Sequence, residues 1–189
     1  MKLGFIGTGN MASAIMGGII SKGAIPADEI IGADLFAPGR ERVKEKFGIH
    51  VTADNNEVVE KADVVLLSVK PQFYADVISG IKDKIRPDQI VITIAPGKTL
   101  SWLADVKIVR CMPNTPAMVG EGMTAACPNE HMTEEEIEYV KTLLSSFSLV
   151  EIVPEKLMDT VTAVSGSSPA YVFMFIEAMA DAAVLDGMP

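Results

Sequence analysis

The stretch KLGFIGTGNMASAIMGGIISK, residues 2–22, decides the fold of this chain. Its two terminal lysines enclose 19 uncharged positions, a length that also suits a membrane span or part of a secretion signal. Five glycines, one asparagine and two serines in this run make a poor lipid-facing helix, and the match to a signal peptide is weak. We therefore favour a third interpretation, in which the stretch begins a folded domain.

In this interpretation the stretch divides into three parts. KLGFI (2–6) is a short apolar run typical of a β-strand, and GTGNMA (7–12) is a tight turn. The residues that follow place Ile15, Ile19 and Ile20 near one face of a helix. The pattern predicts strand, turn and helix.

The turn matches the G-x-G-x-x-G/A pattern of dinucleotide-binding folds. Gly7 permits the sharp bend, Gly9 leaves room for a diphosphate, and Ala12 lets the helix pack closely on the strand. Free N–H groups at the start of the helix then bind the anion. A glycine-rich turn without a ligand is the alternative, but the position between strand and helix favours a cofactor site. Its residues are Gly7, Thr8, Gly9, Asn10, Met11 and Ala12.

The amino-acid composition argues against several other classes of protein. The 189 residues are 49% hydrophobic and 22% charged, which indicates a folded soluble chain of one or two domains. A formal net charge of −9 without any basic stripe argues against nucleic-acid binding. Two cysteines and two histidines, without ligand spacing, predict buried reduced thiols and no metal site. We expect a cytoplasmic protein with neither a membrane nor a nucleic acid as partner.

Apolar runs and helical patterns alternate along the chain. We expect strands at 29–34, 48–51, 63–69, 89–95, 106–112 and 149–153, and helices at 39–47, 55–62, 70–85 and 133–147. This alternation predicts an α/β fold with a Rossmann-like, doubly wound, mainly parallel sheet. Ligands bind beyond the carboxyl ends of such strands, so several turns should meet in one crevice. These are the turns at 7–12, 34, 68–71, 95–97 and 112–116.

Helix ends and the C-terminal region give further expectations. Asn55 or Asn56 is expected to cap helix 55–62, and Thr133 forms a capping box with Glu136. Helices are also expected at about 155–164 and at 168–187. The last is apolar nearly all round, so a partner subunit or further helices should cover it.

Polar residues follow the expected strands. Asp34 ends the second strand, where a carboxylate can accept hydrogen bonds from ribose hydroxyls and repel a 2′-phosphate. An ordinary loop aspartate is the alternative, and Arg40 and Arg42 lie close enough to leave NADPH open. In the loop at 110–122, Asn114 and Thr115 would present an amide and a hydroxyl to the crevice, unless this is only a rigid polar loop.

Four segments, in this order, resemble pyrroline-5-carboxylate reductases. They are GFIGTGNMASAI (4–15), SVKP (68–71), RCMPNTPAMVGEGMT (110–124) and AVSGSSPAYVFMFIEAMADAAVLDGMP (163–189). The resemblance covers the whole chain. It implies a dinucleotide-binding Rossmann domain over 1–153 and the beginning of an all-α dimerisation domain over 154–189. It also implies reduction of the cyclic imine 1-pyrroline-5-carboxylate to L-proline by NADPH or NADH, in a homodimer or larger homo-oligomer.

The resemblance also implies roles for single residues. Residues expected near the ribose and nicotinamide are Asn55, Val69, Lys70, Pro71, Ala95 and Gly97. Asn114 is implied as the catalytic residue beside the reacting carbon, and Glu155 as a substrate-binding residue. Pro96 departs from the family pattern because it lacks an N–H. The family's SPGGTT-type substrate loop is absent, so we expect a C-terminally truncated chain that does not turn over substrate alone.

The chemistry favours an imine. A protonated imine is already electrophilic, so hydride transfer needs positioning more than a strong acid. Reduction of a ketone needs a proton donor, and SGSSPAYVFMF (165–175) has no lysine where related hydroxyacid dehydrogenases place one. A 3-hydroxyacid-type dehydrogenase and a non-catalytic dinucleotide-binding module are the alternatives. The cofactor stays open, because Asp34 favours NADH and the resemblance favours NADPH.

Overall fold

A computed structural model describes residues 2–103 and 105–189. Its described part contains an eight-stranded sheet with the strand order β3-β2-β1-β4-β5-β6-β7-β8. The strands are β1 Leu3–Ile6, β2 Ile30–Ala33, β3 His50–Thr52, β4 Val64–Leu67, β5 Ile90–Thr93, β6 Lys107–Met112, β7 Gly122–Pro128 and β8 Ser148–Ile152. Neighbouring strands are parallel except β6 and β7, which are antiparallel. The predicted doubly wound, mainly parallel sheet is confirmed.

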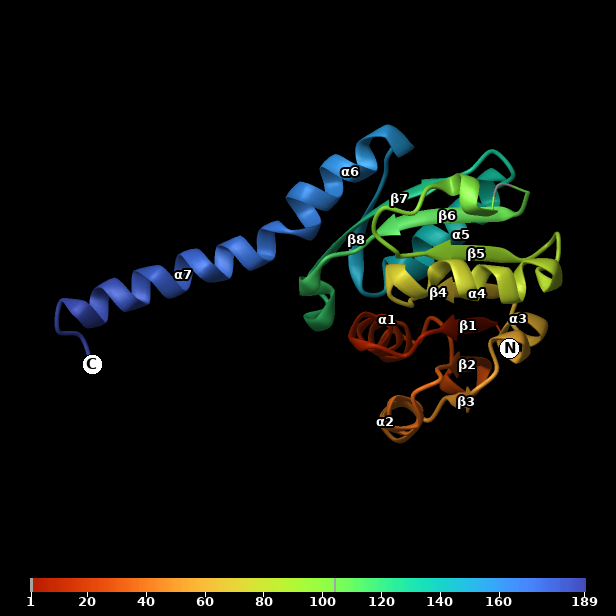
Figure 1. Cartoon of the computed structure of the whole chain (residues 1–189), viewed down its shortest axis with the longest axis horizontal. Coiled ribbons are helices and arrows are strands. Elements are labelled where there is room, and N and C mark those ends of the chain that lie inside the picture. The colour runs from red at the N-terminus through yellow and green to blue at the C-terminus, as the bar shows by residue number, and fades with distance from the viewer. Residues whose placement is uncertain (1, 104) are drawn as a thin grey trace.

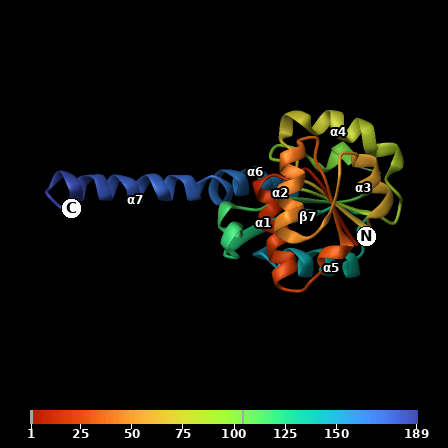
Figure 2. The same ribbon diagram turned by 90° about the horizontal axis from the view of Figure 1, so that it is seen from below.

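Helices cover both faces of this sheet (Figures 1 and 2). They are α1 Asn10–Ser21, α2 Ala37–Phe47, α3 Asn55–Lys61, α4 Tyr74–Ile81, α5 Glu134–Leu144, α6 Met158–Val161 and α7 Ser168–Leu185. Helices α1, α2 and α5 share one core with Phe5 and Leu66, whereas α3 and α4 share the other with Ile6 and Leu67. Successive strand residues point to opposite faces, so each short apolar run is buried on both sides.

The structure differs from the expected elements in two places. Strand β7 was not expected, because GMTAACP (122–128) carries no bulky β-branched residue and follows a proline-rich loop. The helix expected at 70–85 is divided into a 3-10 turn at Pro71–Phe73, α4, and a second 3-10 turn at Lys82–Lys84. The α-helix is shorter than expected because Pro71, which has no N–H, begins the segment and both ends of the segment form 3-10 turns.

Of the two predicted helix caps, one was wrong and the other is confirmed. The expectation that Asn55 or Asn56 caps α3 was wrong, because the Asp54 carboxylate accepts the N–H of Asn56 at 2.9 Å. Asp54 lies one position outside the helix with an extended backbone, as a capping side chain requires. At α5 the capping box between Thr133 and Glu136 is confirmed.

The C-terminal region is one long helical run, Glu155–Leu185, that projects from the sheet (Figure 1). A π-helical turn at Thr162–Gly166 joins α6 to α7, so the two helices expected here are continuous. By length and composition this run could cross a membrane, and none of its most apolar 18-residue window is buried in the single chain. The apolar side chains of α7 are therefore not buried within the described part of one copy.

The candidate cofactor crevice

Two adjoining cavities of about 460 and 720 Å³ lie at the carboxyl ends of the parallel strands. Both are lined by Gly9 and by 68–70, so they form one continuous crevice. The first extends to Asp34 after β2, and the second extends to Pro96 and Pro113 after β5 and β6. The predicted convergence of five turns is confirmed, because parallel strands deliver their carboxyl ends to one edge.

The two glycines of the first turn serve different purposes. Gly7 has φ +96°, and a Cβ there would lie 2.8 Å from the backbone oxygen of Ser68. At Gly9, apart from its neighbours along the chain, no described atom lies within 4 Å of such a Cβ. Gly7 is therefore required by the fold itself, whereas the open space above Gly9 is available to a ligand.

The beginning of α1 is suited to an anion. Its N-cap is Gly9, which has no side chain to bind the first N–H groups, and the first turn has no acidic residue. Asn10 and Met11 line the larger cavity beside Gly9, and Ala12 is buried against the sheet. Unpaired N–H groups at the positive end of a helix bind phosphate. These residues fit the diphosphate of a dinucleotide.

Asp34 lines the smaller cavity but is also bonded within the chain. Its Oδ2 accepts hydrogen bonds from the backbone N–H of Thr8 at 2.8 Å and from the Thr8 hydroxyl at 3.0 Å. Its Oδ1 accepts the N–H of Phe36 at 3.0 Å. Asp34 thus holds the glycine turn against the end of β2, a role that spacing in the sequence did not reveal. Asn55 lines the same cavity.

On the other side of the glycine turn, the crevice is lined by residues after β4 and β5. Val69 and Lys70 line both cavities, and Pro71 lines the larger one. After β5, Ile94 and Pro96 line the crevice, while Ala95 between them is 3% exposed and packs in the core. Gly97, with φ +71°, turns the chain away from the strand. Ala95 and Gly97 line neither of the two described cavities, and their contact with a cofactor stays a prediction.

Asn114 joins the two most distinctive motifs. Its Oδ1 accepts the N–H of Met123 at 2.9 Å, and its Nδ2 lies 3.5 Å from the Ser165 hydroxyl. The amide therefore ties the loop after β6 to the start of β7 and to the long helix. The structure places Asn114 next to crevice-lining Pro113 and Thr115, with its amide oxygen already bonded.

Glu155 belongs to an ion-pair network around the buried Arg110 that sequence reasoning missed. Its Oε1 accepts the N–H of Leu100 at 2.8 Å and lies 3.3 Å from Nη1 of Arg110, whose side chain is 5% exposed. Asp159, one helical turn further, binds Nη2 of Arg110 at 3.1 Å. An arginine inside a strand was the available signal, because a buried guanidinium requires carboxylate partners.

The glycine turn, the open helix start and the crevice at a doubly wound sheet define a dinucleotide-binding protein of the Rossmann class. Two family models match this chain: "NADP oxidoreductase coenzyme F420-dependent" over residues 2–97, and "Pyrroline-5-carboxylate reductase dimerisation" over residues 155–189. The pyrroline-5-carboxylate reductase of Escherichia coli K12 is 44% identical, in an alignment covering 100% of this chain and 72% of the relative.

Solved structures agree. A pyrroline-5-carboxylate reductase from Coxiella burnetii superposes with a TM-score of 0.90 at 35% identity, covering 100% of this chain and 72% of that one. The Plasmodium falciparum enzyme, solved with NADP bound, has a TM-score of 0.89 at 32% identity, with 100% and 71% covered. The chain belongs to the pyrroline-5-carboxylate reductase family.

Proposed function

We propose that this protein reduces 1-pyrroline-5-carboxylate to L-proline with NADPH or NADH. The observation that carries the proposal is the continuous crevice, with Asp34 at one end, the glycine turn in the middle and the loop after β6 at the other end. Family membership over the whole chain supports the same reaction. The P. falciparum structure, with NADP bound, supports NADPH as a cofactor.

The cofactor, when bound, supplies a hydride to the imine carbon, and the proton already on the imine nitrogen completes the amine product. The chain's own residues contribute binding and orientation. We assign the diphosphate to the N–H groups that begin α1, the adenosine end to the cavity at Asp34 and Asn55, and the nicotinamide end to residues 69–71, 94 and 96. Apolar Met112 and Pro113 help to exclude water there.

Asn114 and Glu155 are assigned positioning roles in this proposal. The Asn114 amide fixes the loop that closes the nicotinamide end of the crevice. The Glu155 carboxylate fixes the start of the long helix against Arg110 and the turn at Leu100. Neither role requires a general acid, in keeping with a substrate that is already protonated.

We further propose a division into a cofactor domain at 1–153 and a helical domain at 154–189. Strand β8 ends at Ile152 and the long helix begins at Glu155. Side chains such as Phe173, Phe175 and Ile176 are each more than half exposed in one copy, at 66%, 66% and 51%. We propose that a second copy covers these side chains in a homodimer or larger homo-oligomer. We also propose that the protein is cytoplasmic and has neither a membrane nor a nucleic acid as partner.

The proposal is tested on a purified version of the protein that also carries the family's SPGGTT-type substrate loop, mixed with NADPH and 1-pyrroline-5-carboxylate, by following the loss of absorbance of the reduced nicotinamide. We expect proline to form in equal amount to the NADPH consumed. Preferred oxidation of a short 3-hydroxy acid would instead indicate a hydroxyacid dehydrogenase. Cofactor binding without turnover of either substrate would indicate a dinucleotide-binding module.

A further inference from the structure

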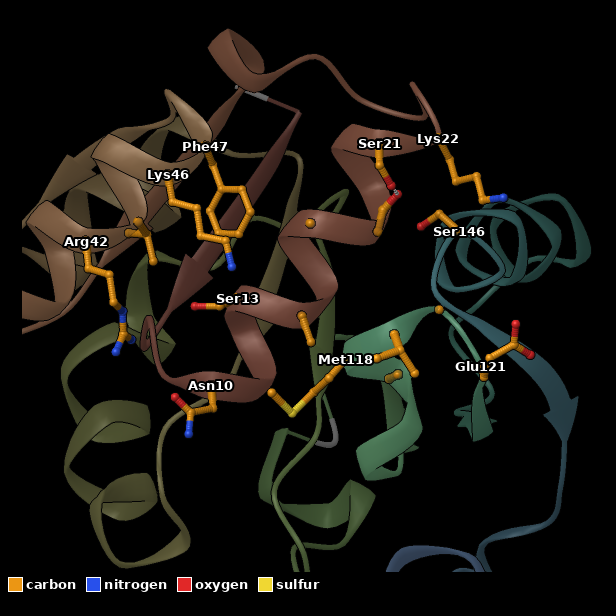
Figure 3. Close-up of a pocket in the computed structure, with 17 residues that line it drawn as sticks. Asn10, Ser13, Ser21, Lys22, Arg42, Lys46, Phe47, Met118, Glu121 and Ser146 are labelled. Atoms are coloured by element: carbon orange, nitrogen blue, oxygen red, sulfur yellow. Dashed lines mark hydrogen bonds between the residues drawn. The ribbon is translucent and has the colours of Figure 1, made fainter. Parts of the chain in front are cut away.

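A long groove of about 680 Å³ runs along the outer face of α1, between α2 and the 3-10 helix Thr115–Val119 (Figure 3). At the beginning of α1 the groove meets the cofactor crevice, because Asn10, Arg42 and Met118 line both. Figure 3 shows the side chains of Asn10 and Arg42 at this same end of the helix. Arg42 is thus a cation at the entrance to the glycine turn.

The guanidinium of Arg42 is held in place but has no counter-ion. Its Nη2 donates a hydrogen bond to the backbone oxygen of Thr8, at 3.1 Å, inside the glycine turn. Within residues 2–103 and 105–189 it forms no salt bridge, whereas Arg86 and Arg110 each pair with two carboxylates. The side chain is therefore ordered by the turn and keeps donors for another acceptor.

This position favours a further anion, because the Asp34 carboxylate at the glycine turn is already bonded to Thr8 and Phe36. The beginning of a helix carries a partial positive charge, so cations are normally favoured at the opposite end. Helix α1 has no acidic residue in its first turn and no side-chain cap to offset that charge. Lys46, one turn along α2 from Arg42, is another cation in the groove, whose opposite side carries Lys22 and the carboxylate of Glu121 (Figure 3). An anion at the start of α1 would remove the repulsion and satisfy the free donors.

We infer that Arg42 is a ligand of the cofactor's diphosphate and closes the glycine-turn site from the α2 side. The inference rests on the proposed function only for the presence of a dinucleotide. Arg42 lines the cavity with Gly9, Asn10 and Met11, and not the cavity with Asp34. It therefore acts on the part that NADH and NADPH share, and a planar guanidinium suits two phosphate oxygens at once.

The test is the binding of NADPH, NADH and ADP-ribose to the Arg42→Met variant, measured by titration calorimetry. A charge-assisted hydrogen bond predicts a roughly tenfold or larger loss of affinity, similar for all three ligands. The dependence of affinity on salt should also become shallower. Arg42→Lys should retain part of the affinity, because the charge remains while the paired geometry is lost.

The matched control is Lys44→Met, which removes one charge from an exposed position on the same helix. We expect its affinities to stay within twofold of the unchanged protein. A loss confined to NADPH would assign Arg42 to the 2′-phosphate and overturn the inference. Unchanged affinities in Arg42→Met, or an equal loss in Lys44→Met, would overturn it as well. Each readout is binding, so a failure of imine turnover leaves the result interpretable.

Discussion

The carboxylate of Asp34 accepts two hydrogen bonds from Thr8, one from its backbone N–H at 2.8 Å and one from its hydroxyl at 3.0 Å. This contact joins the end of β2 to the glycine turn after β1. Asp34 therefore stabilises the cofactor site through this contact, in addition to any hydrogen bond that it accepts from a ribose hydroxyl.

We therefore expect Asp34→Ala to weaken NADH and NADPH together, by several-fold, and to lower the free energy of unfolding by about 1–2 kcal/mol. Denaturant unfolding and calorimetric binding provide the two measurements. Asp83→Ala, which removes an exposed carboxylate from another turn, is the control. A gain in NADPH affinity with unchanged stability would show that Asp34 acts only as a discriminator against the 2′-phosphate.

Gly9→Val should abolish cofactor binding without unfolding the chain. Apart from its neighbours along the chain, no atom of residues 2–103 and 105–189 lies within 4 Å of a Cβ at this position, so the new side chain occupies ligand space and not core space. Gly7→Val is the contrasting variant, because its φ of +96° and the Ser68 backbone at 2.8 Å leave no room. Circular dichroism and dinucleotide titration separate the two effects, and intact affinity in Gly9→Val would refute the site.

The ion-pair network at Arg110 predicts an asymmetry between its members. Glu155→Gln leaves a buried guanidinium with only the exposed carboxylate of Asp159, and we expect a loss of about 2 kcal/mol in stability. Arg110→Met removes the buried charge, and both carboxylates can then be hydrated. Its loss should be smaller than that of Glu155→Gln in urea unfolding. The reverse order would contradict the desolvation argument.

The free energy of unfolding should depend on pH through the ionisation of Glu136. The hydrogen bond from Lys107, at 2.5 Å, and that from the Thr133 backbone hold the pKa of this carboxyl below its ordinary value of 4.5. A pKa lowered by folding stabilises the protein above the unfolded value and loses this effect as the pH falls through the folded one. Glu136→Gln should cost about 1 kcal/mol at neutral pH.

The difference between Glu136→Gln and the unchanged protein should therefore shrink below about pH 4.5 and vanish in stronger acid. Thermal unfolding followed between about pH 3 and pH 7 measures this difference. Glu135→Gln, in the same helical turn but exposed, should show little change. A difference that persists undiminished in acid would mean that packing, and not ionisation, explains the contribution of Glu136.

Much of the site could be predicted from local chemistry. The glycine turn, the carboxylate after β2 and the turn at 68–71 each follow an apolar strand, and parallel topology brings strand ends together. What could not be predicted is how those side chains are used. Asp34 bonds to Thr8, 26 positions away, and Glu155 reaches Arg110 across 45 positions. Such pairs depend on strand order and register, which no local pattern specifies.

The sequence by itself determined the strand–turn–helix at the cofactor site and the doubly wound sheet, because periodicity and glycine placement act over a few residues. Its four motifs carried the resemblance to the reductase family. Only the tertiary structure decided that Asp34 supports the turn, that Glu155 pairs with a buried arginine, and that Arg42 lies beside the start of α1 with no salt bridge among the described residues. The physical reason is that charge and hydrogen-bond partners are chosen by distance in space, which is set only after the sheet has assembled.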